Sequence, residues 1–291
     1  MAAFTDSVRR LMVEHVKPHV PARGWERLRG RGPSRRPPPP APPPLTPRQE
    51  RARRLRSMSL SELAEEFGSD KWGVHRYTPH YEHHFAPLRD EATLVLELGI
   101  GGYSRKKRGG ASLKMWKWFF TRAQIVGVDI EDKTFVDRRR ITSYLGSQTD
   151  RELMERIVRE HGAPTVVIDD GSHRPQDVID SFHILFPMLA DDGVYAIEDI
   201  QTSYWPQWGG SLDPDDPATS MALVRRLLDG LNHEEFLDPG YQPSYTDQHV
   251  VAVHCYHNLV LIQKGDNREG SNKRRVNRRW YEEHPSEFTE P

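Results

Sequence analysis

Two pairs of acidic residues, one of them followed by a histidine, are the residues of this sequence best suited to chemistry. The run "VVIDDGSH" (166–173) carries Asp169, Asp170 and His173, and a later run ends in Glu198 and Asp199. Both pairs follow short apolar stretches typical of buried parallel strands, whose carboxyl ends meet at one edge of a sheet. Carboxylates gathered there raise each other's pKa unless a cation lies among them. Oxygen ligands without nearby cysteines favour Mg²⁺, with Mn²⁺ or Ca²⁺ as alternatives, over zinc.

His173 follows Asp170 by three residues, and an ordinary histidine titrates near neutrality. We interpret it as a general base. Taken singly, each carboxylate is also compatible with a helix cap or a surface ion pair, and His173 with a structural histidine. The metal prediction therefore depends on both acidic pairs lying at the ends of neighbouring strands.

A parallel sheet is needed to bring these residues together, and the chain has the pattern of one. From Leu94 onward, short apolar runs alternate with amphipathic ones, and the last two apolar runs are almost contiguous, as in an antiparallel hairpin. We expect strands at 93–99, 123–130, 141–146, 164–170, 193–199, 249–258 and 259–265, with helices at 112–120, 150–162 and 175–189. The predicted fold is α/β, a Rossmann-like doubly wound sheet of five parallel strands plus a C-terminal antiparallel hairpin.

A glycine-rich turn, "ELGIGGYS", follows the first predicted strand and contains Gly99 and Gly101. Such a turn lets a ligand approach the backbone closely. A dinucleotide-binding turn would have its third glycine at position 104, where this chain has Ser104, so the pattern does not favour NAD. Asp129, at the end of the second predicted strand, can accept hydrogen bonds from both ribose hydroxyls of an adenosine-type ligand.

The motif "DDGSH", with "EDIQTSYW" beginning 28 residues after Asp170, resembles the Mg²⁺-dependent sugar O-methyltransferases of macrolide biosynthesis, the mycinamicin and macrocin type. Related enzymes methylate rhamnose on aromatic polyketides, and all are class I S-adenosylmethionine-dependent methyltransferases. The resemblance covers about residues 60–285. It implies that Asp170, Glu198 and Asp199 bind the metal and that His173 removes the proton of a sugar hydroxyl.

The resemblance also implies a binding site for S-adenosylmethionine. Glu97 lies where the family has a carboxylate near the methionine amino group, and Tyr77, with His75, is expected near the methionine tail. Ser147 and Gln148 take the adenine-contact position, although an ordinary helix N-terminus explains these two equally well. The complete predicted cofactor-binding set is Tyr77, Glu97, Gly99, Gly101, Asp129, Ser147, Gln148 and Asp169.

The implied activity is Mg²⁺-dependent methylation of a vicinal sugar diol on a glycosylated small molecule in antibiotic biosynthesis. We expect the segment from Tyr204 to about Tyr245, with Trp205 and Trp208, to form a lid over the acceptor. Three alternatives stay open: a metal-dependent catechol methyltransferase, a hydroxylase branch of antibiotic biosynthesis, and a nucleic-acid-binding protein with a degenerate Rossmann domain. Larger members of the family carry an additional N-terminal domain that helps assemble a tetramer, so the sequence leaves open whether this chain forms a homo-oligomer.

The N-terminal part differs in composition from the rest of the chain. Residues 1–56 contain 14 Lys and Arg against 4 Asp and Glu, a net charge of +10, and nine prolines lie between Pro33 and Pro47. We predict a basic arm with a short amphipathic helix (1–32), a Pro/Arg-rich linker (33–58) and a methyltransferase domain (59–291). A basic arm can bind nucleic acid or a membrane surface, but without interleaved aromatic residues we favour a charged soluble tail.

The remaining features indicate a cytoplasmic protein. The single cysteine, Cys255, excludes an internal disulfide and a multi-thiolate zinc site. No apolar run approaches the ~20 residues needed to span a bilayer, and the N-terminus lacks a signal-peptide core.

Overall fold

A single seven-stranded sheet organises the part of the chain that the computed structural model describes, residues 44–103 and 107–271. The strand order is β3-β2-β1-β4-β5-β7-β6; the first five run parallel, and β7 and β6 complete the sheet as an antiparallel pair. The strands are β1 (Leu94–Leu98), β2 (Gln124–Asp129), β3 (Ile141–Leu145), β4 (Val166–Asp169), β5 (Val194–Glu198), β6 (Val250–Tyr256) and β7 (Leu259–Lys264). The predicted α/β fold and its terminal hairpin are confirmed.

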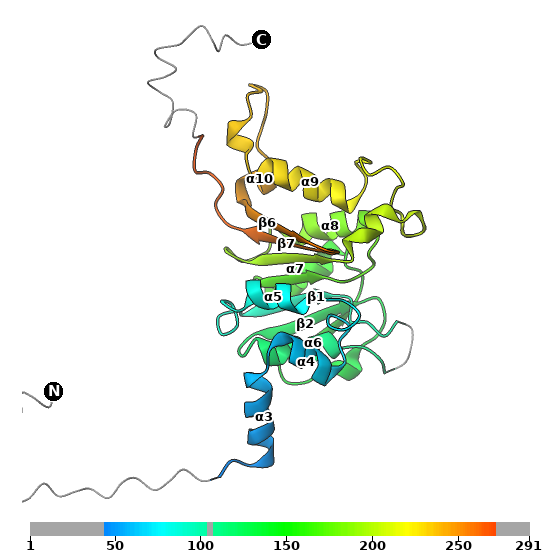
Figure 1. Cartoon of the computed structure of the whole chain (residues 1–291), viewed down its shortest axis with the longest axis vertical. Helices are drawn as coiled ribbons and strands as arrows, with labels where there is room; N and C mark the ends of the chain where they lie inside the picture. Colours follow the sequence, from blue (N-terminus) through cyan, green and yellow to red (C-terminus); the bar gives the residue numbers. More distant parts are fainter. Residues whose placement is uncertain (1–43, 104–106, 272–291) are drawn as a thin grey trace, which may run out of the picture. The chain divides into compact units, whose positions relative to one another are not determined.

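Helices cover both faces of this sheet (Figure 1). They are α3 (Pro47–Ser57), α4 (Leu60–Phe67), α5 (Thr78–Phe85), α6 (Ala111–Phe119), α7 (Arg151–His161), α8 (Pro175–Leu185), α9 (Ser220–Gly230) and α10 (Tyr245–His249). Short 3₁₀ helices lie among them: η2 (Thr134–Val136), η3 (Ile200–Tyr204), η4 (Pro206–Trp208) and η5 (His233–Glu235). No helix in the described ranges has both the length and the apolar character needed to cross a membrane.

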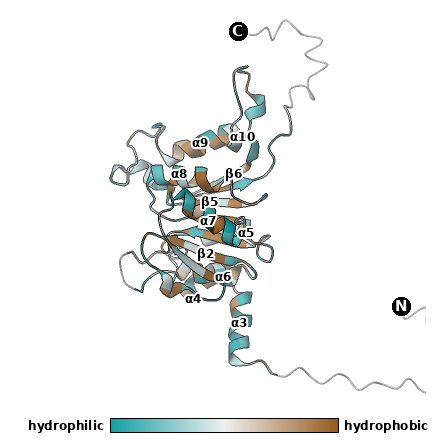
Figure 2. Ribbon diagram, turned by 180° about the vertical axis from the view of Figure 1, so that it is seen from behind, coloured by the Kyte–Doolittle hydropathy of each residue, from teal (hydrophilic) through white to brown (hydrophobic). Residues whose placement is uncertain are grey.

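Two hydrophobic cores lie on the two faces of the sheet. Successive side chains of a strand point to opposite faces. Accordingly, Val95 of β1 packs into a core with α4, α5 and α6, whereas Leu94 and Leu96 pack into a core with α7, α8 and α9. Figure 2 shows the strands largely in the brown of apolar residues. Because both faces of the sheet are buried, every residue of β1 is apolar except Glu97.

Local sequence signals define several helix ends. Ser59 and Glu62 form a capping box at the start of α4, and Gly68 ends it in the left-handed conformation. Asp150 caps α7, and Pro175 begins α8 at the first helical position, where its missing N–H costs no hydrogen bond.

The folded part begins earlier than the sequence predicted. Helix α3 occupies residues that we expected in the linker, and the compact unit that contains it starts at Pro47. Leu55 of α3 is 1 % exposed within the first core, and Arg54 forms a bidentate pair with Glu66 of α4. The predicted boundary at residue 59 places α3 in the linker, whereas the structure packs α3 with the sheet domain, because a run free of proline after Pro47 can continue as a helix. The predicted arm (1–32) and the linker up to residue 43 lie outside the described residues.

The order of the strands reverses between β1 and β4. From β1 the chain proceeds to β2 and β3 on one side, then returns to place β4 on the other side of β1. In open α/β sheets, ligands bind at the carboxyl ends of the strands at this switch point. Leu98 pairs with Asp169, and Asp169 with Ile197, so the loops after β1, β4 and β5 start side by side.

Candidate active site

Asp170, His173 and Asp199 converge at the carboxyl ends of β4 and β5. Atom Nε2 of His173 lies 3.9 Å from Oδ1 of Asp170 and 3.7 Å from Oδ2 of Asp199. One ligand atom from each residue lies within 4.8 Å of the others, and all three side chains are half-buried. Two carboxylates and an imidazole at these distances fit a divalent cation, and the carboxylates suit Mg²⁺ or Mn²⁺.

Two of these residues have unusual backbone conformations. His173 has φ of 55° and Asp199 has φ of 52°, in the left-handed region that residues other than glycine rarely adopt. Such a conformation costs on the order of 1–3 kcal/mol and persists where the surrounding structure enforces it. Two of the seven non-glycine residues with positive φ in the described ranges thus lie in the loops that present the cluster.

A buried lysine lies behind the cluster. Atom Nζ of Lys71 lies 2.7 Å from Oδ2 of Asp170, 2.6 Å from Oε1 of Glu198 and 3.3 Å from Oε1 of Glu97. Burial alone would lower the pKa of Lys71, but the three carboxylates outweigh it and raise the pKa, so the side chain stays charged. Sequence reasoning missed Lys71, although the surplus of carboxylates required a cation.

Glu198 lies outside the three-residue cluster that the structure brings together. The side chain is 3 % exposed, and its Oε1 accepts hydrogen bonds from Lys71 and from the hydroxyl of Tyr81 at 2.7 Å. Burial, followed by repulsion from Asp170, raises the pKa of Glu198 well above its ordinary value. A role for Glu198 as a metal ligand stays a prediction.

Tyr77 lies beside Asp199, the residue that directly follows β5. Its hydroxyl donates to Oδ1 of Asp199 at 2.7 Å and to the carbonyl of Asn258 at 3.3 Å, while the ring stacks on His75. Burial would raise the pKa of Asp199, but the Tyr77 hydrogen bond and the neighbouring His173 lower it. Tyr77 therefore orients a predicted metal ligand, and its contact with the methionine tail stays a prediction.

The glycine turn after β1 is packed against the loop after β4. Gly99 has φ of +84°, and a Cβ there would lie 2.1 Å from the carbonyl oxygen of Asp170. Only glycine allows this approach, which brings the predicted cofactor turn into contact with the loop after β4. Gly101 is also left-handed, with φ of +72°, and has open space around it.

Glu97 offers an acceptor suited to an amino group. Its Oε2 accepts from the hydroxyl of Ser112 at 2.8 Å, whereas Oε1 is buried and accepts no hydrogen bond from the described residues. Burial raises the pKa of Glu97 to about 7. The Lys71 ammonium lies 3.3 Å from Oε1 without a hydrogen bond to it, so Oε1 can still accept a hydrogen bond from the α-amino group of a methionine-type cofactor.

Asp129 and Ser147 lie at the ends of β2 and β3. The carboxylate of Asp129 accepts from the backbone N–H of Ile100 at 3.0 Å and of Glu131 at 2.9 Å, which ties the glycine turn to β2. Ser147 is exposed and shares a hydrogen bond with Thr149. Their cofactor contacts stay predictions.

Gln148 and Asp169 belong to an internal network. Gln148 donates to Asp169 at 3.1 Å, and its Oε1 accepts from the backbone N–H of Ser172 at 2.7 Å. Asp169 is 1 % exposed and also accepts from the hydroxyls of Ser181 and Tyr195. The oxygens of Asp169 thus bond to the interior and, through Gln148, hold the loop after β4 in place, whereas the cofactor contacts of Gln148 and Asp169 stay predictions.

The segment after β5 is only partly a loop. Trp208 in η4 is 38 % exposed, and its ring centroid lies 6.1 Å from that of His173 in an edge-on arrangement. Further along, α9 packs Leu223, Val224 and Leu227 into the second core. The part from 204 to 219 can therefore border an acceptor, whereas α9 is framework.

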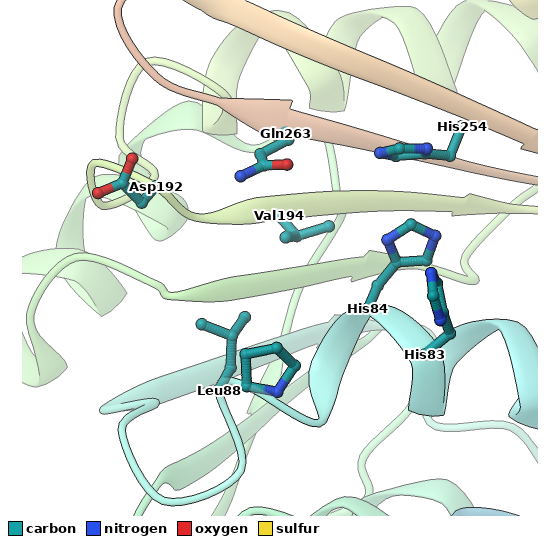
Figure 3. Close-up of a pocket in the computed structure, with 8 residues that line it drawn as sticks. His83, His84, Leu88, Asp192, Val194, His254 and Gln263 are labelled. Atoms are coloured by element: carbon teal, nitrogen blue, oxygen red, sulfur yellow. The ribbon is translucent and has the colours of Figure 1, made fainter.

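The structure also contains a cavity of about 250 Å³, which Figure 3 shows with its lining residues. It is lined by His83 and His84 of α5, His254 of β6, and Val194 at the start of β5, the end of that strand opposite Glu198. Burial, followed by the neighbouring histidines, lowers the pKa of His84 to about 4. None of the predicted site residues lines the cavity.

No family model matches the sequence, but similar proteins are known. The chain is 48 % identical over 214 residues to demethylmacrocin O-methyltransferase of Streptomyces fradiae, covering 72 % of this chain and 54 % of that protein. It is 45 % identical over 218 residues to mycinamicin VI 2''-O-methyltransferase of Micromonospora griseorubida, covering 74 % and 55 %. A solved structure of the MycE methyltransferase in complex with Mg, SAH and mycinamycin VI aligns with a TM-score of 0.71 at 45 % identity, over 74 % of this chain and 55 % of that one.

The chain spans about half the length of the curated relatives it matches. Over that half, the TM-score and the sequence identity indicate the same fold as the seven-stranded sheet described above. Over these residues the chain is similar to the macrocin- and mycinamicin-type O-methyltransferases, and its fold is that of the S-adenosylmethionine-dependent methyltransferases.

Proposed function

We propose that this protein transfers a methyl group from S-adenosylmethionine to a sugar hydroxyl of a glycosylated natural product, with Mg²⁺ as its metal cofactor. The observation that carries the proposal is the convergence of Asp170, His173 and Asp199, with the Lys71 ammonium linking Asp170 to Glu97, whose Oε1 accepts no hydrogen bond from the described residues. The relatives support it, since they are O-methyltransferases of macrocin and mycinamicin compounds, and the MycE structure is a complex with Mg and SAH.

The residues have distinct roles in this proposal. When bound, S-adenosylmethionine supplies an electrophilic methyl group, and Mg²⁺ supplies the positive charge that makes a hydroxyl of a vicinal diol more acidic. Asp170 and Asp199, with Glu198, hold the ion, and Glu97 binds the amino group of the cofactor. Nε2 of His173 accepts the hydroxyl proton, a contribution of about 10²- to 10⁴-fold.

The remaining residues of the site contact the cofactor and the acceptor. Gly99 and Gly101 line the cofactor turn, Asp129 binds the ribose hydroxyls, and Ser147 borders the adenine. Trp208 packs against a sugar face of the acceptor, because an exposed indole beside the base offers a flat apolar surface. A homo-oligomer and a cytoplasmic location stay predictions.

A direct assay tests the function. The purified full chain is incubated with S-adenosylmethionine, Mg²⁺ and either glycosylated macrolides and aromatic polyketides with a free vicinal sugar diol, or a simple catechol, and the products are identified by mass spectrometry and NMR. We expect a methyl ether on the sugar. Methylation of the catechol alone would identify a catechol methyltransferase, and a hydroxylated product would identify the hydroxylase branch.

A further inference from the structure

Lys71 joins the ends of three strands through one ammonium group. Its carboxylate partners are Glu97 in β1, Asp170 directly after β4 and Glu198 at the end of β5. The Lys71 side chain is 1 % exposed, and those of Glu97 and Glu198 are 0 % and 3 % exposed. Three carboxylates, two of them scarcely reached by solvent, thus share one positive charge.

The two carboxylate oxygens of Asp170 have different neighbours. Its Oδ2 bonds to Lys71 at 2.7 Å, whereas its Oδ1 faces His173 and the metal cluster at 3.9 Å. Asp170 therefore touches both the buried ammonium and the proposed metal position. A positive charge on one oxygen reduces the charge that the other oxygen offers to a cation.

Hydrogen bonds fix the backbone around Lys71, so the position of its ammonium group is well defined. The carbonyl of Lys71 accepts from the backbone N–H of Tyr77 at 3.1 Å and of Thr78 at 3.3 Å, which links it to the start of α5. On the other side, Gly68 ends α4 in the left-handed conformation. The lysine is thus built into the domain from two helices.

From this geometry, we propose that Lys71 is a positioning residue that acts as a resident cation. It holds the carboxylates of Glu97, Asp170 and Glu198 together in the metal-free protein, and it moderates the affinity of the site for a divalent ion by competing for Asp170. The inference rests on the proposed metal site, although it concerns a residue that the methyl transfer itself does not use. Its consequence is that the domain stays folded and metal-ready without an ion.

The test compares thermal unfolding of the full chain in EDTA and in Mg²⁺ for the wild type, Lys71→Met and Lys71→Arg. In EDTA, we expect Lys71→Met to melt well below the wild type, because three carboxylates lose their counter-charge. Mg²⁺ should then raise its melting temperature by more than it raises that of the wild type, and calorimetry should show about tenfold tighter Mg²⁺ binding or more. Lys71→Arg, which keeps the charge, should behave like the wild type in both buffers.

Lys264 provides a matched control. It is also buried, at 4 % exposure, but its ammonium donates to the carbonyls of Pro187 and Leu189. Lys264→Met should lower the melting temperature without enlarging the Mg²⁺ shift. If Lys71→Met fails to fold in EDTA, rescue by Mg²⁺ or by adding Glu97→Gln supports the proposal.

An equal Mg²⁺ shift in Lys71→Met and the wild type overturns the proposal, as does a Lys71→Met chain that stays unfolded in EDTA, in Mg²⁺ and with Glu97→Gln. Absence of any Mg²⁺ effect on the wild type removes the metal site, and the proposal with it. Methyl transfer enters none of these readouts, so a failure of the proposed acceptor chemistry is recognised separately.

Discussion

The imidazole of His173 and the carboxylate of Asp199 face each other from the ends of β4 and β5, with Nε2 3.7 Å from Oδ2. Both residues have a left-handed backbone conformation, with φ of 55° and 52°, although neither is glycine. The distance exceeds a hydrogen bond, so the two groups do not satisfy each other directly. The geometry therefore leaves the imidazole available to a substrate proton while the carboxylate stays available to a cation.

Replacing His173 with alanine should nearly abolish methyl transfer. Loss of a general base costs about 10²- to 10⁴-fold in rate, whereas no cofactor contact of this residue is proposed. We expect the rate constant for turnover to fall by that factor, and calorimetry to give a nearly unchanged affinity for S-adenosylhomocysteine.

The exposed His183 of α8 provides the control, because His183→Ala removes an imidazole that has no role in the proposed chemistry and leaves the carboxylates intact. It should retain wild-type turnover. A fully active His173→Ala would remove this residue from the mechanism.

Removing the hydroxyl of Tyr77 should weaken the metal site. Tyr77→Phe deletes the 2.7 Å hydrogen bond that orients Asp199, and partners of this kind affect metal affinity by about 10- to 100-fold. We expect a higher Mg²⁺ concentration for half-maximal activity and recovery at saturating Mg²⁺. Chelation of the metal by EDTA should stop methyl transfer by the wild type and by Tyr77→Phe. Activity that does not change with EDTA would rule out a role for the metal.

The buried Asp169 should make the metal-free protein less stable as the pH rises. Burial raises its pKa to about 6 from an ordinary value of 3.8, so between these values the folded state binds more protons than the unfolded state. The free energy of unfolding should therefore fall through this window, by on the order of 2–3 kcal/mol from this residue at about 1.4 kcal/mol per pH unit.

Urea unfolding in EDTA at about pH 4 and pH 7 measures this slope. Asp169→Asn should reduce the slope, whereas Asp191→Asn, at an exposed position before β5, should keep the wild-type slope. Equal slopes in all three proteins would show that Asp169 does not titrate in this window.

Trp208 should affect acceptor binding more than cofactor binding. Its ring lies 6.1 Å from that of His173 and is partly exposed, so Trp208→Ala removes a surface for the sugar. We expect the KM for the acceptor to rise several-fold, with Trp208→Phe closer to the wild type. An unchanged KM in the alanine variant would place the sugar elsewhere.

Helix α3 should contribute to the stability of the domain. Leu55 is 1 % exposed in the first core, so Leu55→Ala should lower the free energy of unfolding by about 2–5 kcal/mol. A chain that lacks residues 1–57 should melt below a chain that lacks residues 1–46, because only the first has lost α3. Equal melting temperatures of the two deletions would show that α3 does not stabilise the domain.

Several features were determined by the sequence alone. The seven strands lie within the predicted ranges, because apolar runs of this length between turns report burial in a sheet locally. The placement of Asp170, His173 and Asp199 at one edge also followed, since parallel strands end together. The helix at 47–57 was missed because the proline-rich run before it dominated the composition of the region.

Only the tertiary structure decided which residue neutralises the carboxylates, and which carboxylates lie in the interior and which at the surface of the site. The sequence indicated that these carboxylates required a cation, but Lys71 and Asp170 are 99 residues apart, and no local pattern relates them. Likewise, Asp169 and Asp170 are adjacent in sequence, yet one bonds to Ser181 and Tyr195 in the interior and the other faces His173. Periodicity assigns residues to strand ends, whereas the partner of each charge depends on the packing of distant segments against those ends.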